Sequence, residues 1–279
     1  MSSKSGTLPA RTATALILLA VILTLIWKPE LRFAFTLFVV ALASVGLYEY
    51  YGIVRSAQIV PEAAAGIVAG ALVVFSGHTH LPVATAFALY GATLLVATLH
   101  VVRGQYSVAG LAASVFGVVY VGWCGAHLIL LHGIPGIGPG LATLLLLAVA
   151  LSDAGAYFVG RTIGKHKMAP ALSPNKTWEG AAGGLLAALA GMAAFHVVQA
   201  RLCWTVLPQW SFGYCVYAGA VLSIVAQIGD LCESCLKRSA GVKDSGILFP
   251  GHGGVLDRCD GYLFAAPILY YMSTPALSG

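Results

Sequence analysis

The segment QIGDLCESCLKRSAGVKDSGILFPGHGGVLDRCDGY, residues 227–262, is the stretch from which the fold and function of this chain are predicted. Apolar runs over residues 214–228 and 261–272 flank it. Charge at the edge of hydrocarbon is costly, so ionisable residues there usually serve a function. Carboxylates bind hard cations, whereas Lys, Arg and glycine amides bind phosphate. The segment holds both kinds of group, and its ionisable side chains are Asp230, Glu233, Lys237, Arg238, Lys243, Asp244, His252, Asp257, Arg258 and Asp260.

The composition is that of a membrane protein. Of 279 residues, 59% are hydrophobic and 9% are charged, whereas a soluble domain has about 25% charged residues. The net charge of +5 is small, which argues against a nucleic-acid partner. The six cysteines lie mostly within apolar runs, as buried hydrophobic residues do. Cys232 and Cys235 form a C-x-x-C pair without a second pair, so we interpret that spacing as accidental.

The hydropathy pattern predicts an all-α polytopic membrane protein. A helix needs about 20 apolar residues to cross a bilayer, and on that measure we expect about nine transmembrane helices. The first run is interpreted as a retained helix, because Lys-Pro-Glu rather than a cleavage site follows Trp27. The expected spans are residues 12–27, 33–53, 63–77, 82–101, 107–131, 141–160, 178–199, 213–237 and 255–273.

The basic residues predict the orientation of these helices. With the N-terminus in the cytoplasm, twelve basic residues fall on the cytoplasmic side and three on the other. The positive-inside rule favours this arrangement. It places the charged loops 161–177 and 238–254 on one cytoplasmic face and the C-terminus outside.

The charges also divide the chain into two parts. Residues 1–152 hold 9 of the 25 charged residues. We expect residues 1–140 to form about five helices that serve as a scaffold facing lipid and a dimer partner. Residues 141–279 are expected to form about four helices that carry the catalytic cavity. In the first part, Glu49 is interpreted as an interfacial structural residue, and His78, His80, His100, His127 and His132 lack metal-ligand spacing.

Two aspartates are predicted at equal depth in the membrane. Asp153 lies eight residues before Arg161, and Asp230 lies eight residues before Arg238. At the helical rise, each lies about 12 Å inside a helix end. Such a pair indicates one water-filled cavity open to the cytoplasm. The alternative for Asp153 is a hydrogen bond to a neighbouring helix that serves only the structure.

The helix that contains Asp230 carries further charges on the same face. Glu233 and Lys237 follow at offsets of three and seven residues, which places all three side chains on one side of a helix. A binding site and a buried Glu233–Lys237 pair both explain this pattern.

Two loops are predicted to bind phosphate. In the first, Ser173, Asn175 and Thr177 can cap the next helix beside Lys176, although an ordinary basic loop has the same composition. In the second, residues 250–260, glycines let backbone N–H groups approach an anion at the start of the last helix. Asp257 and Asp260 are neighbours there. A plain glycine turn with capping aspartates is the alternative.

With these clusters in place, the chain resembles the phosphatidate cytidylyltransferase (CDP-diacylglycerol synthase) family. The 27 residues from Ser234 to Asp260 are similar to the family signature, with Cys259 where an aliphatic, aromatic or Thr residue is usual. A second block, residues 173–180, is also similar, with Asn175 at a position that is often Lys. The matching segments are Ser234-Cys-Leu-Lys-Arg238, Lys243-Asp244, His252-Gly253-Gly254 and Asp257-Arg258-Cys259-Asp260.

The resemblance implies a Mg²⁺-dependent membrane enzyme that converts CTP and phosphatidate to CDP-diacylglycerol and pyrophosphate. It implies Asp230 and Asp257 as metal ligands, with Asp153 and Asp260 as further candidates. It also implies a homodimer and a second, monovalent cation such as K⁺. The short termini favour a bacterial inner membrane over the endoplasmic reticulum, and the basic residues place the active site on its cytoplasmic side. We assign catalysis to Asp230, Asp257, Lys237 and Arg258. The expected substrate-binding residues are Ser173, Asn175, Lys176, Thr177, Glu233, Arg238, Lys243, Asp244, His252, Gly253 and Gly254.

Other functions fit the sequence less well. A cation transporter could use Asp153, Asp230 and Asp257, but transporter sites tend to lie near the midplane, and the basic residues here would repel a cation. A CDP-alcohol phosphotransferase would carry an Asp-Gly-x-x-Ala-Arg pattern, which is absent from this sequence. A scaffold without catalysis is the third alternative.

Overall fold

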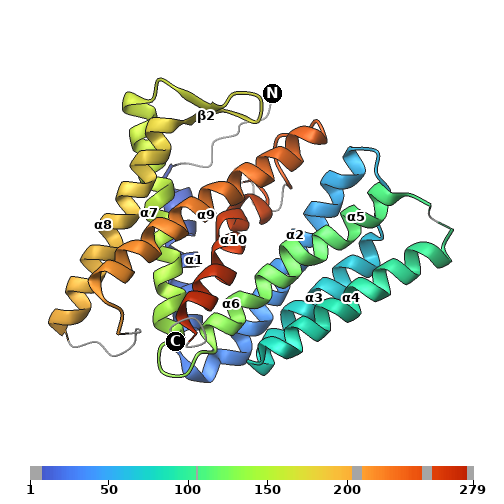
Figure 1. Cartoon of the computed structure of the whole chain (residues 1–279), viewed down its shortest axis with the longest axis horizontal. Helices are drawn as coiled ribbons and strands as arrows, with labels where there is room; N and C mark the ends of the chain where they lie inside the picture. Colours follow the sequence, from blue (N-terminus) through green and yellow to red (C-terminus); the bar gives the residue numbers. More distant parts are fainter. Residues whose placement is uncertain (1–7, 105, 203–208, 247–252, 275–279) are drawn as a thin grey trace.

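A computed structural model describes residues 8–104, 106–202, 209–246 and 253–274, which form helices and one short hairpin (Figure 1). The helices of the first half are α1 (Leu8–Trp27), η1 (Pro29–Leu31), α2 (Arg32–Ser56), α3 (Ala63–Ser76), η2 (Gly77–Thr79), α4 (Pro82–Val102), α5 (Val108–Gly117), the π-helical η3 (Val118–Trp123) and α6 (Cys124–His132). The second half contains α7 (Gly138–Ile163), β1 (Lys167–Ala169), β2 (Ser173–Thr177), α8 (Trp178–Leu202), α9 (Phe212–Ser239) and α10 (Leu256–Ser273).

The expected helices are present. Within the described residues, six helices are long and apolar enough to cross a membrane, so the chain is an all-α polytopic membrane protein apart from the hairpin. The predicted spans 12–27, 63–77 and 255–273 correspond to α1, α3 and α10, which are not among those six helices. The total of nine spans therefore stays a prediction. The six are Pro29–Ser56, Pro82–Val102, Val108–His132, Gly138–Ile163, Trp178–Arg201 and Phe212–Ser239.

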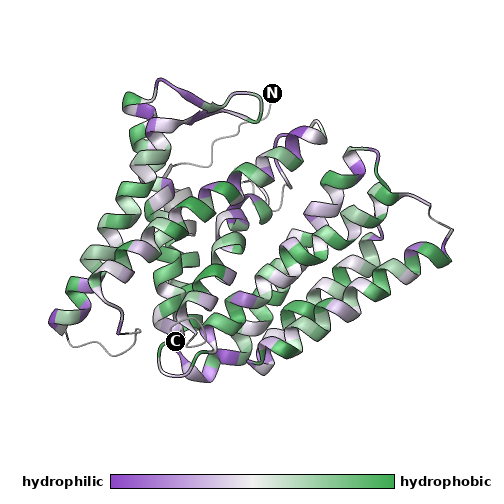
Figure 2. Cartoon of the chain, in the orientation of Figure 1, coloured by the Kyte–Doolittle hydropathy of each residue, from purple (hydrophilic) through white to green (hydrophobic). Residues whose placement is uncertain are grey.

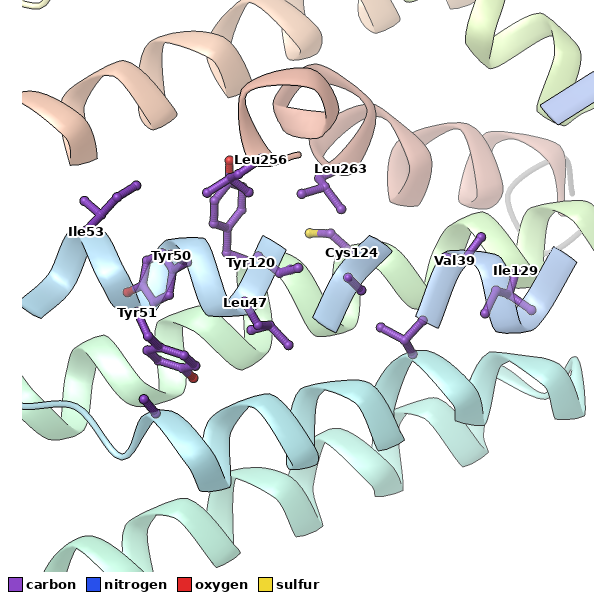
Figure 3. Close-up of a cluster of buried hydrophobic side chains, with 14 of the residues drawn as sticks. Val39, Leu47, Tyr50, Tyr51, Ile53, Tyr120, Cys124, Ile129, Leu256 and Leu263 are labelled. Carbon is purple, nitrogen blue, oxygen red and sulfur yellow. The ribbon is translucent and has the colours of Figure 1, made fainter. Parts of the chain in front are cut away.

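The last helix, α10, lies between the two halves of the bundle. It packs against α9 and α7 on one side and against α6, η3 and α2 on the other. In Figure 3, Leu256 and Leu263 of α10 lie over Leu47, Tyr120 and Cys124 in a buried apolar cluster. Because burial of apolar surface stabilises this contact, the start of α10 is held against α2.

The π segment η3 interrupts an otherwise continuous helix from Val108 to His132. The hydroxyls of Tyr50 and Tyr51 on α2 donate to the carbonyls of Ala113 and Ser114, one turn before η3. These bonds satisfy carbonyls at a point where the helical hydrogen-bond pattern changes. They also connect α2, which carries Glu49, to the middle of the bundle.

The hairpin β1–β2 was not predicted, because a basic loop was expected over residues 161–177. The strands pair antiparallel, with Lys167 opposite Thr177. Thr177 is buried and its hydroxyl accepts a hydrogen bond from the amide of Gly180, so it caps the start of α8. The hairpin extends beyond the ends of α7 and α8, on the same side of the bundle as the end of α9 (Figure 1).

Polar residues gather at that side of the molecule. Figure 2 shows apolar residues along the helices and hydrophilic residues on the hairpin and toward the end of α9. The guanidinium of Arg238, in the last turn of α9, donates to the carbonyl of Leu172 in the hairpin at 3.0 Å. The structure thus joins the two charged segments that the sequence placed on one face.

The predicted orientation is testable by labelling. In a variant without native cysteines, Lys167→Cys and Lys243→Cys place exposed thiols in the two charged segments. We expect a membrane-impermeant maleimide to label both in inverted vesicles and neither in intact cells, because both should face the cytoplasm. Labelling in intact cells but not in inverted vesicles would contradict the orientation.

Candidate functional site

Three carboxylates from two helices meet at the junction of α9 and α10. One oxygen each from Asp230, Glu233 and Asp260 lies within 4.8 Å of the others. Gly229 permits this approach, because a side chain there would meet the backbone carbonyl of Asp260. Asp153 on α7 is near enough to interact electrostatically with Asp230 and Asp260. Asp153 and Asp230, which the sequence placed at one depth, therefore lie near the same group of acids, and the water-filled cavity stays a prediction.

Glu233 is the most buried member of the cluster, with 1% of its side chain exposed. Its Oε2 accepts from the ammonium of Lys237 at 2.7 Å. Its Oε1 is buried and accepts no hydrogen bond from any donor in the described part of the chain. A buried carboxylate oxygen without a partner is costly, and a bound cation would compensate it. The acid cluster therefore fits a hard divalent cation, which takes oxygen ligands.

Lys237 connects Glu233 to Asp257. Its ammonium lies 2.6 Å from Asp257 Oδ1, with 12% of the lysine side chain exposed. Asp257 Oδ2 accepts from the amides of Gly254 at 2.8 Å and Ser245 at 3.1 Å. Both oxygens of Asp257 are thus engaged within the protein, and the cluster of three potential metal ligands does not include it. The implied role of Asp257 as a metal ligand stays a prediction.

The sequence analysis did not predict the buried position of Glu49 beside the start of α10. It was interpreted as interfacial, whereas its side chain is buried, with 5% exposure. Its carboxylate accepts from the amides of Val255 at 3.1 Å and Leu256 at 2.8 Å and from the hydroxyl of Ser245 at 3.2 Å. A charged residue within an apolar helix run was the signal that could have identified it.

The hairpin contributes a cation to the acid cluster. Lys176 on β2 forms an ion pair with Asp230, at 2.6 Å between Nζ and Oδ2. The hairpin is itself closed by Glu179, which accepts from the amides of Lys165 and His166. Lys176 therefore reaches the acids from a different element than Lys237.

The remaining predicted substrate-binding residues differ in burial, and one of them lies outside the described residues. Ser173 is half-buried, and Thr177 is used as a helix cap. Gly253 has a left-handed backbone, with φ of 81°, which favours glycine. His252 lies outside the described residues. The exposed members of the predicted set are Asn175, Arg238, Lys243, Asp244 and Arg258.

Cys232 and Cys235 on α9 do not form a disulfide bond. Cys232 is half-buried, Cys235 is exposed, and both are free thiols. The described cluster of potential metal ligands contains carboxylates and neither thiol. The interpretation of the C-x-x-C spacing as accidental stays a prediction.

Comparison with known proteins covers nearly the whole chain. The family model described as "Cytidylyltransferase family" matches residues 9–275. A protein of Brucella suis named phosphatidate cytidylyltransferase is 38% identical over 268 residues, which is 94% of this chain and 92% of the relative. One of the same name from Bacillus subtilis is 37% identical over 185 residues, which is 66% of each chain. A third, from Staphylococcus haemolyticus, is 46% identical over 123 residues, or 44% of this chain and 45% of the relative.

The Lys237 contacts predict a stability change. Lys237→Met removes the cation shared by the buried Glu233 and the partly buried Asp257, and breaking a buried pair in this way costs about 3–5 kcal/mol. We expect the midpoint of thermal unfolding in detergent to fall by at least about 5 °C. The exposed Lys243→Met is the matched control and should shift it by less than about 1 °C. Equal midpoints for the two variants would show that the Lys237 contacts contribute little.

Proposed function

This chain belongs to the cytidylyltransferase family, and on that premise we propose that it catalyses the reaction of CTP with phosphatidate. The products are CDP-diacylglycerol and pyrophosphate. The observation that carries the proposal is the acid cluster at the α9–α10 junction, with Lys176 and Lys237 in direct contact with it. The names of relatives that match the chain over 94% of its length support the same reaction.

The chemistry requires such a mixture of charges. Phosphatidate is already an oxyanion, so the attacking oxygen needs little help from a general base. The barrier comes from repulsion between two polyanions and from the in-line geometry required at the α-phosphorus of CTP. Positioning and electrostatic stabilisation are therefore the main tasks of the protein.

Mg²⁺ is the proposed cofactor, held by Asp230 and Asp260 with Glu233 beside them. When bound, it would neutralise phosphate charge, and Mg²⁺ usually takes one or two carboxylates together with substrate phosphates. The unpartnered Oε1 of Glu233 supports this assignment. Asp257 stays in the proposal as the acid that orients Lys237 and as a further ligand. A second, monovalent cation and a homodimer are part of the same proposal.

The basic residues bind the two substrates in this account. Lys176 already reaches Asp230 from the hairpin, so its ammonium can also contact a phosphate placed beside that carboxylate. Lys237 keeps Glu233 and Asp257 in place. Arg258, in the first turn of α10, is assigned to the lipid headgroup or the pyrophosphate. CTP would enter from the cytoplasm, and the lipid from the inner leaflet of a bacterial inner membrane.

The transporter alternative fits the contacts less well. Lys176 forms an ion pair with one acid of the cluster, and Lys237 forms one with another. Both lysines would repel a cation that moves along a pathway. A polyanionic substrate, by contrast, needs positive groups beside its metal ion.

The proposed reaction is tested by pyrophosphate release from purified protein. We expect release that depends on CTP, phosphatidate and Mg²⁺ together. Asp230→Asn and Asp257→Asn keep the size of the side chain and remove its charge, so each should lower turnover by at least about 100-fold while the protein still folds. Asp260→Asn should do the same and should raise the Mg²⁺ concentration needed for half-maximal turnover.

The control is Glu30→Gln, which removes an exposed acid in η1 and should leave turnover unchanged. Near wild-type turnover of both Asp230→Asn and Asp257→Asn, with the same Mg²⁺ dependence, would refute the site assignment. Absence of pyrophosphate release from the wild-type protein would refute the reaction itself.

A further inference from the structure

We propose that Glu49 is a positioning residue, which fixes the first turn of α10 and so the carboxylates of Asp257 and Asp260. The inference rests on the proposed function, because those carboxylates are its proposed active-site groups. Glu49 belongs to α2, in the half of the chain that the sequence analysis assigned to a scaffold. Through Glu49, a residue of that half would help to position the groups that carry out the reaction.

The first support is the cap that Glu49 provides. The first amides of a helix have no partner within the helix, and the residue preceding α10, Val255, has no side-chain cap of its own. The Glu49 carboxylate accepts from the amides of Val255 and Leu256, which lie 206 and 207 residues further along the chain. A negative charge at this end also interacts favourably with the helix dipole. The orientation of the first turn therefore depends on a carboxylate from another helix.

The second support is a chain of contacts from Glu49 to the acid cluster. The hydroxyl of Ser245 donates to Glu49, and the amide of the same serine donates to Asp257. Asp257 contacts the ammonium of Lys237, which in turn contacts Glu233. A shift of the Glu49 carboxylate would thus be transmitted to groups on both α9 and α10.

The third support is the tight fit around the carboxylate. A Cβ atom added at Gly246 or Gly254 would collide with the Glu49 side chain, and at Gly254 also with the hydroxyl of Ser245. Gly254 belongs to the glycine segment that the sequence analysis assigned to phosphate binding. Its contacts give a second reason for glycine there, because a larger residue would displace the Glu49 carboxylate and the Ser245 hydroxyl.

A purely structural role for Glu49 makes a different prediction. If Glu49 only stabilises the fold, its loss reduces the amount of folded protein, while the cation affinity of the folded molecules stays the same. Glu62 is the matched control, because it is also buried, with 3% exposure, and it pairs with Arg103 in the first half of the chain. Glu62→Gln should lower the thermal midpoint without changing cation affinity.

The test measures Mn²⁺ binding to purified protein by electron paramagnetic resonance, together with the Mg²⁺ dependence of turnover. Glu49→Gln keeps the size of the side chain but replaces one accepting oxygen by an NH₂ group, so only one of the amides of Val255 and Leu256 keeps its acceptor. We expect Mn²⁺ affinity to fall by about 10- to 100-fold, as for groups that support metal ligands. The Mg²⁺ concentration for half-maximal turnover should rise to a similar extent. Glu49→Asp, which keeps the charge, should recover part of both losses.

Unchanged Mn²⁺ affinity and Mg²⁺ dependence in Glu49→Gln, with a lower thermal midpoint as in Glu62→Gln, would overturn the proposal. If Glu49→Gln does not fold, Ser245→Ala tests the same contact chain and should weaken Mn²⁺ binding in the same direction. Unaltered Mn²⁺ binding in Ser245→Ala would then overturn it. Because Mn²⁺ binding needs no turnover, a wild-type protein that binds Mn²⁺ but releases no pyrophosphate would refute the reaction and leave this test intact.

Discussion

The ammonium of Lys237 lies between two carboxylates, Glu233 and Asp257, and the arrangement of the site depends on that contact. Taking charges out of water costs several kcal/mol per ion unless each is paired and hydrogen-bonded. Lys237 satisfies one oxygen of each acid, and backbone amides satisfy the other oxygen of Asp257. One oxygen of Glu233 is left without a donor among the described residues. The protein thus neutralises part of the buried negative charge, and a bound cation can neutralise the charge that remains.

The same contact explains why α10 is central to the fold. Its first turn is held from α9 through Lys237 and from α2 through Glu49. Apolar side chains of α10 such as Leu256 and Leu263 pack against the first half of the bundle (Figure 3). The polar contacts fix the orientation of the first turn of α10, whereas the apolar contacts supply most of the stability. The two halves therefore form one scaffold around the acids.

The sequence predicted the helices better than the contacts between them. Apolar runs follow from local composition, so the span predicted at 82–101 agrees with α4, Pro82–Val102. The hairpin was missed, because its strands contain polar residues and its stability depends on contacts such as the Thr177 cap. Asp230 and Asp260 were both identified as candidates. Their meeting with Glu233 depends on the approach of α9 to α10, and the burial of Glu49 depends on residues more than 200 positions away, so no local pattern could predict either contact.

The central claim is that the acids at the α9–α10 junction hold a divalent cation. The most direct measurement is anomalous diffraction from crystals of the protein grown with Mn²⁺. The account predicts the strongest anomalous peak within coordination distance of Asp230 and Asp260, with Glu233 beside it. A structure in which that junction has no peak at saturating Mn²⁺, while Lys176 stays paired with Asp230, would contradict it.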